Sequence, residues 1–103
     1  MIHLHLDISV DSAKEQEMVR YFETVFRPAA QKFEGYVDVR MLKLRAALMG
    51  AAPAKGNYRF ALVYQSEELR QKWIASDVHN TVWGGMEKTF TRHDYDILLF
   101  DAV

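Results

Sequence analysis

The chain has 103 residues, 50% of them apolar and 13% aromatic, which is enough for one hydrophobic core and too little for a second domain. Lys and Arg number 13 against 14 Asp and Glu, so the net charge of -1 lacks the basic surplus that nucleic-acid binding requires. The absence of cysteine excludes disulfides, thiolate metal sites and thiol nucleophiles.

The amino terminus alternates in polarity instead of placing basic residues before an apolar run, so we expect no signal peptide there. No apolar stretch approaches the roughly 20 residues that cross a bilayer. We therefore expect a cytoplasmic protein that has neither a membrane nor nucleic acid as a partner.

The first predicted element is a strand over residues 2–10. Apolar side chains occupy its even positions and polar ones its odd positions, and this period of two is typical of a strand with one buried face. The polar face carries His3, His5 and Asp7.

A helix is predicted to start at Ser12, which stands three residues before Glu15 in the spacing of a capping box. Pro28 removes one backbone donor within this helix and predicts a kink near Thr24. Gly35 is expected to end the helix in the left-handed conformation.

Two further strands are predicted over residues 36–46 and 58–65, joined by an Ala- and Gly-rich loop over residues 47–57. A second helical region is expected to follow, with Ser66 as its first cap. The pair Ser76-Asp77 predicts a break and a new helix start within this region.

A final strand over residues 95–102 completes the order βαββαβ, which indicates an α+β, ferredoxin-like fold with a four-stranded antiparallel sheet and helices on one face. In a monomer the other face should be polar, yet this strand is apolar on both sides. We therefore expect a homodimer in which a second copy covers the open face. The alternative is a bulge in strand 36–46, which would switch parity and make one face only look apolar.

Three local patterns carry a resemblance to a known family. The run 34–36 (Glu-Gly-Tyr) joins the first helix to the next strand, the run 64–68 leads into the second helix, and the run 73–79 continues it. With the element order, these patterns make residues 1–103 resemble a single domain of the dimeric α/β-barrel superfamily, most closely the antibiotic biosynthesis monooxygenase-like domains. That superfamily hosts many chemistries on one fold.

The resemblance implies a dimeric α/β barrel with a pocket between the sheet and the helices. Cofactor-independent monooxygenases of this kind are expected to deprotonate an electron-rich phenolic substrate, which then reacts directly with dioxygen without metal, flavin or other cofactor. A Trp, an Asn, a Tyr and an Arg orient the substrate in such pockets. Here Trp73 and Trp83 supply indoles, and His5 or Asp7 stands in the strand where the Asn would lie.

Two other resemblances have less support from the residues. Heme-degrading relatives share the stretch that begins at Trp73, but Trp83 stands at the spacing where they carry an iron-ligating His. Rhamnose mutarotases resemble the second helix and are expected to use a His on the first helix, which here contains none. We therefore expect neither a heme cofactor nor mutarotation.

The candidate residues are chosen for their side-chain chemistry. Imidazole and carboxylate groups can accept or donate protons, and the candidate catalytic residues are His5, Asp7 and His79. Indole and phenol rings offer a flat surface with a polar tip, and the candidate substrate-binding residues are Trp73, Trp83, Tyr64 and Tyr95. As alternatives, the polar groups can be hydrogen-bonded in a wet barrel interior, and the aromatic rings can belong to the core or the dimer interface. The spacing of His3 and His5, without a third anchored ligand, does not predict a metal site.

Two functions are compatible with this pattern. The first is a cofactor-independent monooxygenase-like enzyme that acts on a small aromatic or hydrophobic compound in the pocket. The second is a non-catalytic homodimer that binds a hydrophobic ligand or serves as a stress-related accessory protein. An open cavity with convergent polar groups would favour the enzyme, whereas a cavity plugged by Phe22, Trp83 and Met86 would favour the second function.

Overall fold

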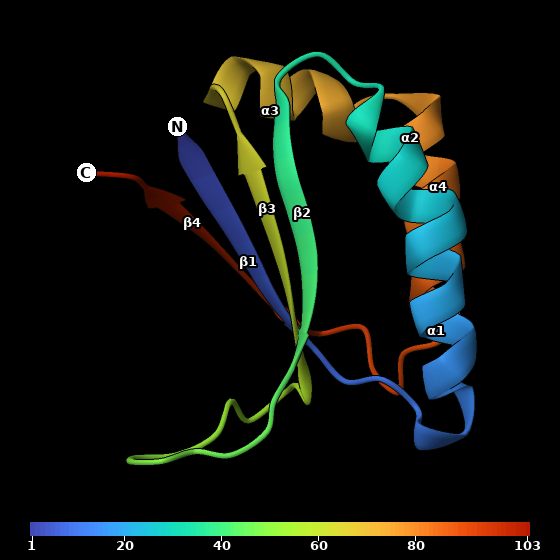
Figure 1. The fold of residues 1–103 in the computed structure, drawn as a ribbon, viewed down its shortest axis with the longest axis vertical. Coiled ribbons are helices and arrows are strands. Elements are labelled where there is room, and N and C mark those ends of the chain that lie inside the picture. The colour runs from blue at the N-terminus through green and yellow to red at the C-terminus, as the bar shows by residue number, and fades with distance from the viewer.

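A four-stranded antiparallel sheet forms one layer of the molecule, and the helices form the other (Figure 1). The computed structural model describes all residues 1–103. Its strands are β1 (Ile2–Ile8), β2 (Tyr36–Lys43), β3 (Tyr58–Tyr64) and β4 (Asp96–Asp101), which pair in the order β2-β3-β1-β4. The predicted ferredoxin-like order is confirmed. β1 is two residues shorter than predicted, because Val10 makes only an isolated bridge.

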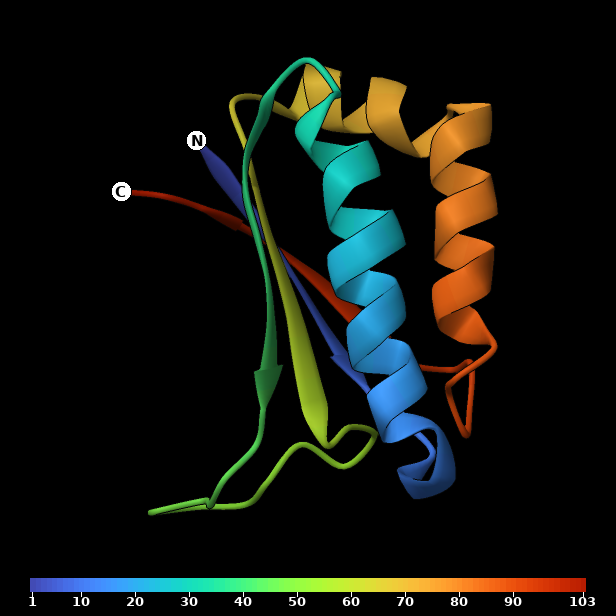
Figure 2. The ribbon, with the colours of Figure 1, turned by 45° about the vertical axis from the view of Figure 1, so that its right-hand side comes forward.

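The helical layer has two long parts that lie side by side, with a shorter helix across one end (Figure 2). The first part is one continuous rod, made of η1 (Ser12–Lys14), α1 (Glu15–Tyr21), the π-helical segment η2 (Phe22–Phe26) and α2 (Arg27–Gln31). The second is α4 (Asp77–Glu87), and the crossing helix is α3 (Glu67–Ile74). No helix combines the length and the apolar character that a membrane span needs.

The start of the first rod differs from the prediction. Asp11, not Ser12, is the N-cap: its carboxylate accepts a hydrogen bond from the backbone N–H of Ala13 at 2.9 Å. The capping box between Ser12 and Glu15 is wrong, because the chain turns one residue earlier and Ser12 already lies in a 3₁₀ turn.

The disturbance caused by Pro28 falls where the sequence places it. Pro28 has no N–H to donate to the carbonyl of Thr24, and the helix widens just before it: Arg27 donates to Phe22, five residues back. The hydroxyl of Thr24 donates to the carbonyl of Arg20 at 2.7 Å. The π-helical segment η2 therefore accommodates the proline within a continuous rod.

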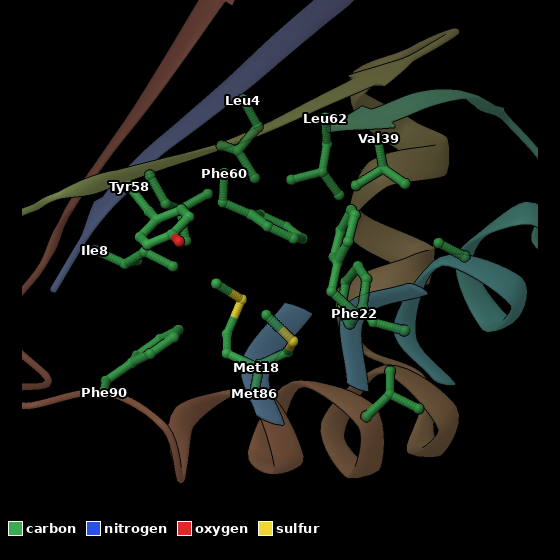
Figure 3. Close-up of a cluster of buried hydrophobic side chains, with 14 of the residues drawn as sticks. Leu4, Ile8, Met18, Phe22, Val39, Tyr58, Phe60, Leu62, Met86 and Phe90 are labelled. Carbon is green, nitrogen blue, oxygen red and sulfur yellow. The ribbon is translucent and has the colours of Figure 1, made fainter. Parts of the chain in front are cut away.

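The core lies between the two layers. Even-numbered residues of β1 and β3 point toward the helices and are buried, as the alternation predicts. Figure 3 shows side chains from the sheet, such as Leu4 and Phe60, meeting Met18, Phe22 and Met86 from the helices. Ser66 and Ser76 cap α3 and α4 as predicted, accepting hydrogen bonds from backbone N–H groups three residues on.

The opposite face of the sheet is uncovered (Figure 1). β4 is an edge strand that leans away from the helices, and its apolar residues are all about half exposed. These residues are Ile97 (56%), Leu98 (48%), Leu99 (46%) and Phe100 (47%). β2 does contain a bulge, between Tyr36 and Asp38, yet Leu42 and Leu44 beyond it are still exposed. The bulge therefore does not account for the apolar open face.

Candidate functional site

A cavity of about 210 Å³ lies between the sheet and the helices, as the resemblance implies. Of its 13 lining residues, 11 are hydrophobic, so it is suited to an apolar ligand. Ile74 of α3 and Ile97 of β4 border it and are both exposed, so the cavity reaches the surface between these elements.

Aromatic rings from the helices and from β3 line the cavity. Phe26, from η2, lies edge-on to Trp83 at 5.9 Å and to Trp73 at 6.3 Å between ring centroids. Phe60, from β3, lies 5.2 Å from Trp83. Trp73 is only 1% exposed and belongs to the core as well as to the wall, whereas Trp83 is half-buried. Both indoles therefore border the cavity, as predicted.

His79 lies at the cavity because α4 begins just before it. The hydroxyl of Ser76 accepts a hydrogen bond from the His79 backbone N–H at 3.1 Å, which fixes the first turn of α4. The imidazole lies edge-on to Trp73, 5.2 Å between centroids. Burial lowers the pKa of His79 below its usual 6.5, partly offset by a hydrogen bond with Asn80. The ring is therefore neutral at pH 7 and able to act as a base.

One end of the cavity is closed by a chain of two hydrogen bonds. The indole N–H of Trp83 donates to the Tyr95 hydroxyl at 3.0 Å, and this hydroxyl donates to a carboxylate oxygen of Glu87 at 3.0 Å. Burial, reinforced by the Glu87 charge, raises the pKa of Tyr95. Glu87 was missed by the sequence analysis, although its spacing of four residues from Trp83 places both on one helix face.

The other predicted tyrosine, Tyr64, ends β3 at the far end of the cavity. Burial raises its pKa well above 10, so the phenol is uncharged at neutral pH. Arg70 of α3 also borders the cavity and was not predicted. Its guanidinium makes a two-point ion pair with Glu67 and holds the pKa of that carboxyl at about 2.

His5 and Asp7 lie on the other face of the sheet. They occupy odd positions of β1, while the even positions face the helices, so His5 does not line the helix-side cavity and that expectation is wrong. The His5 ring lies 5.1 Å from that of Phe100, and burial and the charge of Arg59 lower its pKa. Asp7 makes an ion pair with Arg59 at 2.9 Å. No three His, Asp or Glu side chains come close enough together to hold a metal ion.

A second cavity, of about 480 Å³, lies under the loop that joins β2 to β3, with Asp7 and Arg59 at its border. Much of its wall is an extended loop that projects beyond the sheet (Figure 1), where Leu48 and Met49 are almost fully exposed. The smaller cavity has mostly buried walls and gathers five of the seven predicted site residues, so it is the better candidate site despite its size.

The strand order, the two layers and the helix-side cavity define a ferredoxin-like α+β protein. No protein-family model and no curated protein sequence matches the chain. The fold, however, is that of solved structures whose names include antibiotic biosynthesis monooxygenases, so the resemblance seen in the sequence is confirmed at the level of the fold.

Three of these structures illustrate the similarity. A candidate antibiotic biosynthesis monooxygenase from Caulobacter crescentus CB15 has a TM-score of 0.78 at 18% identity, over 99% of this chain and 89% of that one. SnoaB, a cofactor-independent oxygenase from Streptomyces nogalater, has a TM-score of 0.67 at 18% identity, over 98% and 91%. A dimeric ferredoxin-like protein of unknown function from Jannaschia sp. CCS1 has a TM-score of 0.79 at 8% identity, over 98% of each chain.

Proposed function

We propose that the chain is a cofactor-independent, monooxygenase-like enzyme that acts on a small aromatic compound in the helix-side cavity. The observation that carries this proposal is the convergence of His79, Arg70 and two tyrosines on one apolar cavity, where polar groups from separate elements can orient a ligand. Fold similarity to named oxygenases is supporting analogy only.

The size of the cavity limits the substrate. About 210 Å³ exceeds the roughly 150 Å³ of an apolar cavity that holds benzene, and it is below the roughly 300 Å³ at which pockets for drug-sized ligands begin. A flat compound of one or two rings fits this interval, between the indole of Trp83 and the ring of Phe60.

The proposed reaction begins with removal of a proton from an electron-rich phenol. Neutral His79 is the base within the cavity, and the apolar walls exclude water from the resulting phenolate. The phenolate reacts with dioxygen at one ring carbon. In the keto tautomer of the phenolic substrate this carbon bears two hydrogens. One oxygen atom enters the product as a carbonyl, and the other leaves as water with those two hydrogens.

A second candidate function is binding without turnover. It is favoured by the apolar character of the cavity, in which 11 of 13 lining residues are hydrophobic. The plugged cavity that would have favoured it most is absent, because Phe22 and Met86 belong to the core and do not line the cavity.

Oxygen uptake separates the two functions. The purified chain is given a panel of one- and two-ring hydroquinones and three-ring anthrones in an oxygen-electrode cell. We expect uptake with the smaller compounds, and about a hundredfold loss in kcat for His79→Gln, as is typical on removal of a general base. His3→Gln, on the opposite face, is the matched control and should retain the rate. Binding of these compounds with no uptake above the uncatalysed rate would exclude the enzyme and leave the binding protein.

We also propose that the protein acts as a homodimer, in which the open sheet face of one copy covers that of the other. The support is the apolar surface of β4, exposed on both of its sides. The relative from Jannaschia sp. CCS1 is named a dimeric protein.

A further inference from the structure

Trp83, Tyr95 and Glu87 are linked by two hydrogen bonds at one end of the cavity. Trp83 and Glu87 lie one turn apart on α4, and Tyr95 comes from the turn that precedes β4. That turn is fastened to the end of α4, because the His93 ring lies 3.0 Å from the Glu87 carbonyl oxygen. The geometry of the three side chains therefore does not depend on a bound ligand.

The direction of both hydrogen bonds is fixed by chemistry. An indole N–H can only donate and a carboxylate can only accept, so the Tyr95 hydroxyl accepts a hydrogen bond from Trp83 and donates its own to Glu87. The Tyr95 oxygen has no other hydrogen-bond partner in the protein, and one of its two lone pairs is unused. Toward a ligand, Tyr95 can therefore accept a hydrogen bond but cannot donate one.

The other end of the cavity has the opposite polarity. Tyr64 pairs with Ile2 in the sheet, whereas β4 begins opposite Asp7, so Tyr64 and Tyr95 lie at opposite ends. The Tyr64 hydroxyl makes no hydrogen bond within the protein, and Arg70 bonds Glu67 through only two of its three nitrogens. Both residues retain a free donor.

We propose that Tyr95, oriented by Glu87, forms a subsite that can only accept a hydrogen bond and therefore selects an aromatic ligand with a hydroxyl group at that end. At the other end, the free donors of Tyr64 and Arg70 can bind a carbonyl or a second hydroxyl of the same ligand. This inference rests on the proposed function, because it presupposes that the helix-side cavity binds an aromatic ligand. Glu87 is a positioning residue that acts through Tyr95. An ether or a ketone oxygen at the Tyr95 end would face a lone pair and leave the subsite unsatisfied.

A matched pair of ligands tests the subsite. 4-Hydroxyacetophenone carries a hydroxyl and a carbonyl at opposite ends of one ring, and 4-methoxyacetophenone differs only by the methyl group that removes the donor. Affinities of both are measured by titration calorimetry with the full chain. We expect the hydroxy compound to bind about tenfold more tightly, the worth of one well-formed hydrogen bond.

Three variants separate orientation from simple contact. Tyr95→Phe should bring the affinity ratio to about one. Glu87→Met keeps the length of the side chain and frees the Tyr95 proton to point at the ligand, so the ratio should fall below about threefold while the methoxy compound binds no worse. Glu68→Met, at an exposed position on α3, is the control and should keep the wild-type ratio.

The outcomes are distinguishable. The proposed subsite is overturned if the wild-type chain binds the two ketones equally well. It is also overturned if Glu87→Met keeps the wild-type affinity ratio while Tyr95→Phe loses it, because Glu87 then does not orient Tyr95. Either result leaves the proposed function standing. If neither ketone binds at millimolar concentration, the cavity is not an aromatic site and both proposals are wrong. Since Tyr95→Phe removes only one oxygen atom, it keeps the test decisive even if Glu87→Met does not fold.

Discussion

A single hydroxyl, that of Ser76, joins the core of the molecule to the candidate site. It donates to the Trp73 carbonyl at 2.6 Å and accepts from the His79 N–H at 3.1 Å, so it closes α3 and opens α4 at once. Trp73 is buried and His79 borders the cavity, and the position of the imidazole therefore depends on this one cap.

Ser76→Ala is expected to cost about 1 kcal/mol in the free energy of unfolding, the usual worth of an N-cap, and to weaken ligand binding in the cavity several-fold. Ser66→Ala removes the cap of α3, where the hydroxyl accepts from Leu69 at 3.2 Å away from His79, and gives the matched control. Urea unfolding should show similar losses for both variants, while ligand titration should single out Ser76→Ala. Equal effects on binding would mean that the cap does not position His79.

The lowered pKa of His79 makes stability depend on pH. The pKa of His79 in the folded chain lies below its unfolded value of 6.5. At pH values between these two pKa values the unfolded chain binds more protons than the folded chain, so the free energy of unfolding rises with pH. The stabilisation is complete above about pH 6.5 and is lost as pH falls through the folded pKa. His5, whose pKa is also lowered, contributes in the same direction.

His79→Gln should therefore flatten, without abolishing, the fall in unfolding free energy between pH 7.5 and pH 5. His5→Gln combined with His79→Gln should flatten it further. The measurement is urea unfolding at several pH values, and an unchanged slope in both variants would contradict the burial of these rings as its cause.

At the scale of elements, α4 packs closely against the first rod through a glycine. A side chain at Gly85 would overlap the phenol ring of Tyr21 in α1, whereas a side chain at Gly84 would meet nothing within 4 Å. α4 continues through both glycines to Glu87. The close approach of the two helices therefore explains why position 85 is a glycine. Nothing in the structure explains the glycine at position 84.

Gly84→Ala and Gly85→Ala should consequently change stability in opposite directions. Replacing a glycine inside a helix by alanine gains roughly 0.5–1 kcal/mol where the added methyl group meets no other atoms, and this is the expectation at position 84. At position 85 the same gain is outweighed by displacement of Tyr21, with a net loss of about 1–2 kcal/mol. Thermal unfolding of the two variants checks the sign, and a stabilised Gly85→Ala would show that α4 and α1 are further apart.

Local pattern was enough to predict most elements but not the contacts between them. The alternation of β1 and the caps Ser66 and Ser76 were correct because each depends on residues close in sequence. Gly35 has the predicted positive φ, 92°, but it does not end the helix, which stops at Gln31 with Lys32 as its C-cap. Alternation alone does not say which face of β1 the helices cover, and this left His5 assigned to the wrong side. Glu87 was missed because its partner Tyr95 reaches it only through the fold.

At the scale of the whole molecule, the two faces of the sheet differ in what they offer. The helices cover one face of the sheet, which contains the core and the cavity, and leave the other open (Figure 1). The open face exposes Leu98 and Phe100 beside the half-buried His5. Apolar side chains on an uncovered face favour association, and a closed two-fold dimer covers both copies at once.

Phe100→Asp tests that dimer. In the separate chain Phe100 is 47% exposed at the edge of the sheet, so the substitution should leave the fold intact, but in a dimer it would bury a carboxylate and raise the dissociation constant at least about thirtyfold. Val78→Asp is the control, because Val78 is similarly exposed (53%) but lies on α4, away from the open face. Sedimentation at micromolar concentration should give twice the 12.0 kDa chain mass for the wild type and Val78→Asp, and the single chain for Phe100→Asp. A 12.0 kDa particle for the wild type would overturn the homodimer proposal.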